Sequence, residues 1–145
     1  MNFLSYNVCG LSSFLKRKQL GSLIRKDCFD VCLLQERKLS QLSAISVFEL
    51  WGGTNVEWTF KPFIGDSGGM LLLWKQGFFP SCFSFTGEGF VGVGGFWKNS
   101  LVYVVNVYSS CFYAKKRSLW RYLEEIEKRF LVEGWILVDD FNTVR

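Results

Sequence analysis

Eight short apolar runs, separated by glycine, proline and polar turn residues, constrain the fold of this chain most. They cover residues 2–6, 31–35, 56–60, 70–74, 81–85, 90–97, 101–108 and 135–138. Each run has the length of a β-strand, and all are far shorter than the roughly 20 apolar residues that a membrane-spanning helix needs. The run VCLLQ at 31–35 is apolar almost throughout, which is typical of a strand covered on both faces.

Two helical patterns interrupt these runs. The first covers residues 14–26 and places Leu20, Leu23 and Ile24 on one face. The second covers residues 116–132, where Leu119, Leu123, Ile126 and Phe130 recur every three or four residues. Strands and helices in this order predict one mixed α/β domain over residues 1–145, since this length is enough to bury a core.

Composition excludes several other classes of protein. An apolar content of 49% argues against disorder. The N-terminus MNFLSYNVCG lacks the basic and apolar regions of a secretory signal, so we expect a nuclear or cytoplasmic protein that is not secreted. Its five cysteines are scattered, which favours reduced, buried thiols. Because the chain has no histidine, a zinc site built on Cys28 and Cys32 is not favoured.

Two basic runs stand out in a chain of net charge +4: Lys16–Arg17–Lys18 and Lys115–Lys116–Arg117. Both lie in or beside the predicted helices, where they have two interpretations. They are either solvated helix surface or contacts to the phosphate backbone of a nucleic acid.

The segment GEGFVG at 87–92 has the glycine spacing of a dinucleotide-binding loop. Such a loop must lead from a strand into a helix, so that phosphate meets the N-terminus of the helix. Here another strand follows, and the glycines are therefore predicted to mark a hairpin or bulge.

Polar side chains follow three of the apolar runs at the point where each run ends. They are Asn7, Glu36 and Asp140. In layered α/β folds the carboxyl ends of strands gather where ligands bind. Oxygen ligands without histidine or thiolate suit a hard cation such as Mg²⁺, which most often serves attack on phosphate.

Five segments in fixed order carry a resemblance to a known family. LSYNVCGL, DVCLLQE, SGGMLLLW, VVNVY and WILVDDFN together resemble the endonuclease/exonuclease/phosphatase superfamily. Within it, the whole chain is most similar to the endonuclease domain of plant LINE-type (non-LTR) retrotransposons. The resemblance implies a DNase I-like fold with two sheets packed face to face and helices outside. It also implies phosphodiester hydrolysis with Mg²⁺ or Mn²⁺ and DNA as the partner. No membrane is expected, because the apolar runs are too short to span one, and no obligate protein partner is evident.

The resemblance assigns roles to individual residues. It implies that Glu36 binds the metal and that Asn7 helps to hold the metal and phosphate region. Tyr108 would contact the scissile phosphate, although plain packing of its ring is a rival interpretation. Asp140 would orient or deprotonate the attacking water, and Asn142 would stabilise the pentavalent phosphorus.

The chain departs from the family in two places. Asp139 stands where the family usually has glycine before Asp-Phe-Asn, and strand alternation predicts that it faces away from the metal. The family's second half carries a further aspartate and a Ser-Asp-His motif, whereas this chain has no histidine. We therefore expect a domain that is incomplete at its C-terminus, with impaired or absent hydrolysis. The alternatives are a non-catalytic nucleic-acid-binding remnant, a remnant without function, or a sugar-phosphate or lipid phosphatase of the same superfamily.

Overall fold

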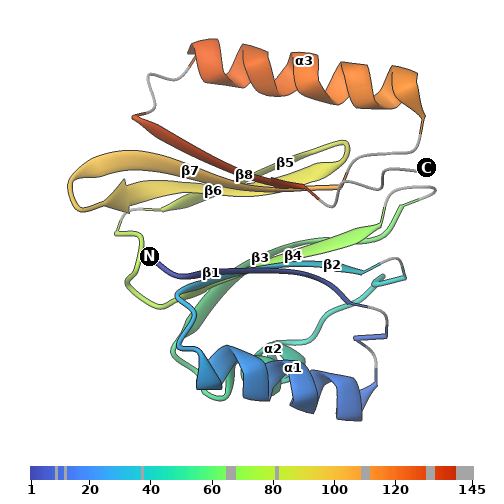
Figure 1. Cartoon of the computed structure of the whole chain (residues 1–145), viewed down its shortest axis with the longest axis vertical. Helices are drawn as coiled ribbons and strands as arrows, with labels where there is room; N and C mark the ends of the chain where they lie inside the picture. Colours follow the sequence, from blue (N-terminus) through green and yellow to red (C-terminus); the bar gives the residue numbers. More distant parts are fainter. Residues whose placement is uncertain are drawn as a thin grey trace.

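The computed structural model arranges the chain in four layers, helix–sheet–sheet–helix (Figure 1). It describes residues 1–8, 10–11, 13–36, 38–64, 68–80, 82–108, 112–129 and 133–139, without the side chain of Asp139. No helix in these ranges is long and apolar enough to cross a membrane.

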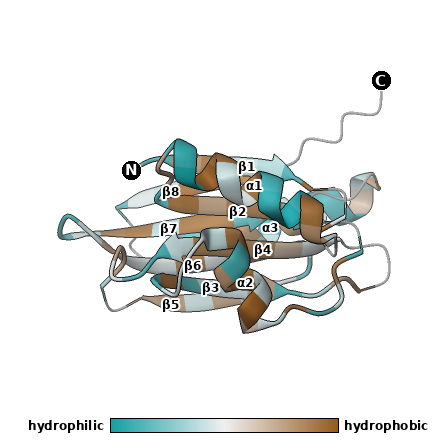
Figure 2. Ribbon diagram, turned by 90° about the horizontal axis from the view of Figure 1, so that it is seen from below, coloured by the Kyte–Doolittle hydropathy of each residue, from teal (hydrophilic) through white to brown (hydrophobic). Residues whose placement is uncertain are grey.

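The first sheet has the strand order β1-β2-β4-β3. Its strands are β1 (Phe3–Asn7), β2 (Val31–Glu36), β3 (Val56–Lys61) and β4 (Gly69–Lys75). β1 and β2 run parallel, and β4 is antiparallel to both of its neighbours. The helices α1 (Phe14–Lys26) and α2 (Ala44–Trp51) cover its outer face, and bands of hydrophobic and hydrophilic residues alternate along them (Figure 2).

The second sheet has the order β5-β6-β7-β8. Its strands are β5 (Phe83–Gly87), β6 (Phe90–Trp97), β7 (Ser100–Val107) and β8 (Gly134–Asp139). β5, β6 and β7 form an antiparallel meander, and β8 returns parallel to β7 after α3 (Tyr113–Arg129), which covers the outer face.

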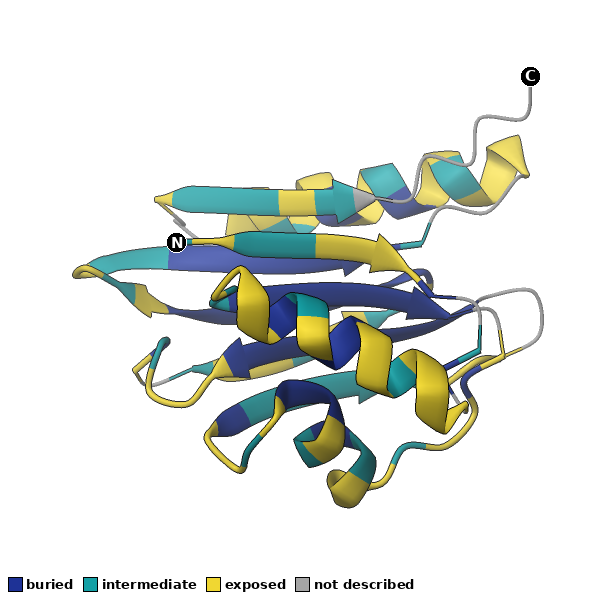
Figure 3. Ribbon diagram, turned by 60° about the horizontal axis from the view of Figure 1, so that its bottom comes forward, coloured by how far each residue is buried: buried dark blue, intermediate teal, exposed yellow. Residues whose placement is uncertain are grey.

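Strand alternation divides the apolar side chains between the layers. On β2, Val31 and Leu33 point into the space between the sheets, whereas Cys32 and Leu34 pack under α1 and α2. All six residues of β2 are buried, so the expectation of a strand covered on both faces is confirmed (Figure 3). The same alternation on β7 places Val102 and Val104 between the sheets, and Val105 beneath α3.

A polar bridge crosses the otherwise apolar space between the sheets. Asn106 on β7 is 0% exposed and Gln35 on β2 is 1% exposed. The Gln35 Nε2 donates to Asn106 Oδ1 at 2.6 Å. Asn106 Nδ2 in turn donates to the backbone carbonyls of Leu34 at 3.1 Å and Leu71 at 3.3 Å. Because buried amides are costly when unpaired, this set of bonds favours one register between the sheets.

Most predicted elements are present, with shifted ends. The first helix has the predicted bounds, and the third begins at Tyr113 rather than at 116. The segment GEGFVG forms the predicted hairpin, since β5 ends at Gly87 and β6 starts at Phe90. α2 was not predicted at all, because its eight residues are too few to show a clear helical period.

The cysteines are only partly as expected. Cys32 is buried, and burial raises the pKa of its thiol to about 12, so it stays protonated at neutral pH. Cys28 is exposed, and the expectation that it is buried is wrong: it follows the end of α1 in a left-handed conformation with φ 51°. Both are free thiols. Cys9 and Cys111 lie outside the described residues.

The polar bridge gives the first prediction. We expect Asn106→Leu to lower the free energy of unfolding by about 2 kcal/mol, because it leaves the Gln35 amide buried and unpaired. The double variant Gln35→Leu/Asn106→Leu removes both partners and should be more stable than Asn106→Leu alone. Urea denaturation of the four proteins of this cycle measures the coupling. Simple addition of the two single effects would show that the two amides do not act as a pair.

Candidate active site

Several chain segments meet at one edge of the sandwich. β1 and β2 are parallel and end there together, since Asn7 is paired with Gln35. β4 runs the opposite way and begins there, with Gly69 opposite Glu36. β7 and β8 also end at this edge, on the right in Figure 1. The predicted gathering of strand ends is therefore what the fold produces.

The carboxylate of Glu36 is held by the loop that follows β1. Its Oε2 accepts hydrogen bonds from the backbone N–H of Gly10 at 2.8 Å and of Leu11 at 2.5 Å. Glu36 is only 7% exposed, so these bonds partly replace the water that it loses. Among the described residues Oε1 receives no such bond, and this oxygen is the one available to a cation.

Gly68 brings the other sheet to Glu36. A Cβ at this position would lie 3.2 Å and 3.3 Å from two ring atoms of Tyr108, and 3.4 Å from the backbone oxygen of Glu36. Tyr108 itself directly follows β7, and its N–H donates to the carbonyl of Gly89 at 2.8 Å. The absence of a side chain at Gly68 thus allows the Tyr108 ring to approach the end of β2.

The structure describes only part of the remaining predicted catalytic residues. Asn7 ends β1 and is exposed, one strand away from Glu36. Asp140 and Asn142 lie outside the described residues, as does the side chain of Asp139. The structure therefore brings Glu36 and Tyr108 together at the edge where Asn7 ends its strand, and the orientation predicted for Asp139 stays a prediction.

The donor atoms at this edge fit a hard cation in type. Glu36 supplies carboxylate oxygen and Asn7 amide oxygen, which are ligands that Mg²⁺ accepts. Across the described ranges there is no group of three or more histidine, cysteine, aspartate or glutamate residues that could hold a metal. A cation here would keep several water ligands, as Mg²⁺ usually does, unless further carboxylates join it.

The two basic runs lie near the first turns of α1 and α3. Because these helices follow β1 and β7, both begin at the edge where those strands end (Figure 1). Lys16, Lys18, Lys115 and Arg117 are exposed and Lys116 is half-buried. α3 has no acidic residue in its first turn that would offset its positive charges. Exposed cations therefore flank the edge from both outer layers.

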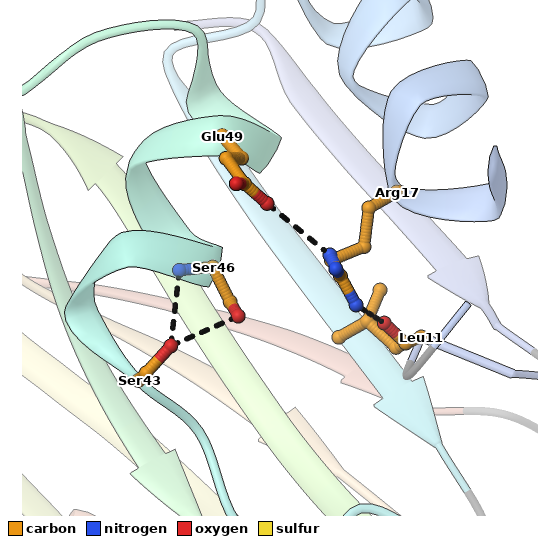
Figure 4. A network of polar contacts seen from close by, with 5 residues as sticks. All are labelled: Leu11, Arg17, Ser43, Ser46 and Glu49. Carbon is orange, nitrogen blue, oxygen red and sulfur yellow. Dashed lines mark hydrogen bonds and ion pairs between the residues drawn. The ribbon is translucent and has the colours of Figure 1, made fainter. Parts of the chain in front are cut away.

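Arg17 has structural partners near the site. One guanidinium nitrogen donates to the carbonyl of Leu11 at 2.9 Å, and Nε lies 3.6 Å from the Glu49 carboxylate on α2 (Figure 4). Arg17 thus connects α2 with the loop that holds Glu36. Nearby, the Ser43 side chain accepts from the N–H of Ser46 and so caps α2.

Sequence reasoning missed three features of this site. It did not predict the amides of Gly10 and Leu11 as partners of Glu36, the close approach at Gly68, or the bridge from Gln35 to Asn106. Two signals were present: consecutive glycines directly before a buried strand, and a single asparagine inside the apolar run VVNVY.

No protein-family model matches the sequence, and no curated protein matches it either. Solved structures do match. The endonuclease domain of TRAS1, a telomere-specific non-LTR retrotransposon, has a TM-score of 0.60 at 15% identity, over 97% of this chain and 58% of that chain. The AP endonuclease LMAP from Leishmania major has a TM-score of 0.66 at 19% identity, over 97% of this chain and 54% of that chain. D. rerio TDP2, complexed with a single-strand DNA product, has a TM-score of 0.59 at 15% identity, over 94% of this chain and 58% of that chain.

These similarities define the class of fold. The chain has an α/β fold with two mixed four-stranded sheets and flanking helices, and this arrangement matches about half of a DNase I-like domain. Its length corresponds to little more than half of the three matched structures. The retrotransposon endonuclease domain is one of these matches, and at 15% identity it shows a shared fold alone.

The contact at Gly68 gives the second prediction. Gly68→Ala places a methyl group against the Tyr108 ring, which must move by a few tenths of an ångström. We expect changed NMR signals for this ring and a loss of about 1 kcal/mol of stability, as in other overpacked sites. Gly53→Ala is the matched control, since its added methyl would meet only the end of the Asn55 side chain. Unchanged Tyr108 signals in Gly68→Ala would contradict the close approach.

Proposed function

We propose that this chain is part of a metal-dependent phosphodiesterase that acts on DNA, of the retrotransposon endonuclease type. The observation that carries the proposal is the Glu36 carboxylate, fixed by the amides of Gly10 and Leu11, at the end of a strand whose last carbonyl lies, like the Tyr108 ring of the other sheet, next to Gly68. Fixed groups of this kind suit catalysis, because they need no reorganisation when charge develops on the substrate.

In this proposal Glu36 holds Mg²⁺ or Mn²⁺ with help from Asn7. The cation would neutralise charge on the phosphate and polarise the attacked bond. The Tyr108 hydroxyl would donate a hydrogen bond to a phosphate oxygen and so position the scissile group. Asp140 would orient or deprotonate the attacking water, and Asn142 would stabilise the pentavalent phosphorus, both by resemblance to the family.

DNA as the substrate is supported by the charges around the edge. Lys16 and Lys18 lie near the start of α1, and Lys115 and Arg117 near the start of α3, and these two helices begin on opposite outer layers at the edge where the strands end (Figure 1). Contacts of this kind bind phosphate without reading sequence, so the proposed binding depends steeply on salt. Arg17 would contribute indirectly, by holding the loop beside Glu36.

Hydrolysis by these 145 residues is proposed to be weak. The family's phosphate chemistry uses a histidine, and this chain has none. Loss of one acid–base or electrostatic group commonly costs about 10² to 10⁴ in rate. The second candidate function is therefore DNA binding without catalysis, which the exposed cations alone would support.

Nicking of supercoiled plasmid tests the proposal and gives the third prediction. We expect slow nicking with Mg²⁺ or Mn²⁺, about 10² to 10⁴ below that of an intact superfamily endonuclease. Glu36→Gln should abolish it, because the change removes the negative charge that Glu36 offers to the cation. Glu127→Gln, an exposed change on α3, is the control for loss of one negative charge.

The outcomes separate the two candidates. Nicking that persists in Glu36→Gln would exclude this site as its source. No nicking, together with salt-dependent DNA binding that is unchanged in Glu36→Gln, would support the binding function. Nicking as fast as that of an intact endonuclease would contradict the proposed impairment.

A further inference from the structure

A cavity of about 540 Å³ opens between the β5–β6 turn and the first half of α3. The residues that matter here are Glu88, Phe90, Tyr108, Lys115, Ser118 and Tyr122. Its size lies within the roughly 300 to 1,000 Å³ of small-molecule sites in proteins. Residues 87–90 of the predicted hairpin therefore line a cavity in which Tyr108 alone has a proposed catalytic role.

Aromatic rings form much of the cavity wall. Phe90 is 1% exposed and Tyr122 is 49% exposed, with their ring centroids 5.5 Å apart and their planes tilted by 33°. The half-buried ring of Tyr108 is a third. Tyr122 and Tyr108, which are partly open to solvent, provide stacking surfaces for a planar ligand, and the buried Phe90 supports the ring of Tyr122.

The β5–β6 turn is shaped and anchored so that the cavity stays open. Gly89 has a φ of +82°, which strains other residues, and a Cβ there would lie 3.2 Å from the carbonyl oxygen of Tyr108. From the first sheet, Lys61 Nζ donates to the carbonyl of Gly87. Lys61 thus ties the turn to the end of β3, on the opposite sheet.

Polar groups at the cavity match the edges of a nucleotide. Glu88 accepts hydrogen bonds, and the Ser118 hydroxyl, which donates to the Ala114 carbonyl at 3.0 Å, has an oxygen that can still accept. Lys115 adds one positive charge for a phosphate. Aromatic surface, hydrogen-bonding groups and one cation together suit a nucleobase with its attached phosphate better than a purely apolar ligand.

Tyr108 joins this cavity to the candidate active site. The same side chain lines the cavity and approaches Gly68 beside Glu36. We propose that the cavity binds one unstacked nucleobase of a DNA single strand, next to the phosphate that Tyr108 contacts. The proposal rests on the proposed action on DNA, and adds a site that prefers strands in which a base is free to leave the stack.

The fourth prediction compares two strands of about ten nucleotides, one normal and one whose bases are replaced by hydrogen. Their binding is measured by fluorescence anisotropy in the presence of a chelator, so that no hydrolysis occurs. We expect the normal strand to bind about tenfold more tightly, as stacking of one base provides. Ser118→Phe fills the cavity and should remove this preference, while leaving binding of the base-free strand unchanged.

The control is a second serine of the same kind. Ser22 is exposed on α1 and donates to Lys18 at i−4, as Ser118 donates to Ala114. Ser22→Phe should keep the tenfold preference. Tyr122→Ala removes one aromatic wall of the cavity and adds no bulk, so it should reduce the preference for the normal strand. This second variant keeps the test decisive if Ser118→Phe does not fold.

Equal binding of both strands by the unmodified protein would overturn the cavity proposal, as would a preference that survives both Ser118→Phe and Tyr122→Ala. These results are independent of nicking. A preference for the normal strand without any nicking would refute catalysis and retain the cavity site. Nicking without such a preference would retain catalysis and refute the cavity site.

Discussion

The buried hydrogen bonds of Asn106, to Gln35 and to two backbone carbonyls, are the interaction on which the site depends. They cross an otherwise apolar interior, and Asn106 also bonds the carbonyls of two strands of the opposite sheet. Apolar packing alone tolerates small displacements between sheets, but buried amides are costly in any register that leaves them unpaired. This bridge therefore sets how β7 lies over β2.

The bridge also affects the residues that follow it, one position after Gln35 and two positions after Asn106. Glu36 directly follows Gln35, and Tyr108, two residues after Asn106, packs against the core between the sheets. Fixing the two amides thus helps to place the Tyr108 ring near the backbone at the end of β2, with Gly68 between them. Tyr108 in turn contacts the cavity under α3, so the same bridge affects both proposed sites.

Local patterns in the sequence predicted the layers well, because strands and helices differ in the period of their apolar residues. VCLLQ was predicted as a doubly covered strand, and the face of α1 was predicted from Leu20 and Ile24. α2 was missed because one short apolar segment has no distinct period. The carboxylate at the end of β2 was predicted, since it needs only a strand and its end.

The partners of that carboxylate were beyond the sequence, because they come from contacts between distant residues. Gly10 and Leu11 lie about 25 positions from Glu36, and Asn106 lies 71 from Gln35. No periodic pattern encodes which loop amide will face which side chain. The structural role of Arg17 within the basic run likewise depends on a tertiary contact, with the carboxylate of Glu49 on another helix.

Mn²⁺ titration followed by NMR tests the central claim, that the edge beside Glu36 and Tyr108 is a cation site. A bound paramagnetic ion broadens nearby amide signals without requiring any hydrolysis. We expect early broadening at Gly10, Leu11, Gly69 and Tyr108, and loss of this effect in Glu36→Gln. Broadening first at the exposed glutamates of α3, or equally in Glu36→Gln, would contradict the account.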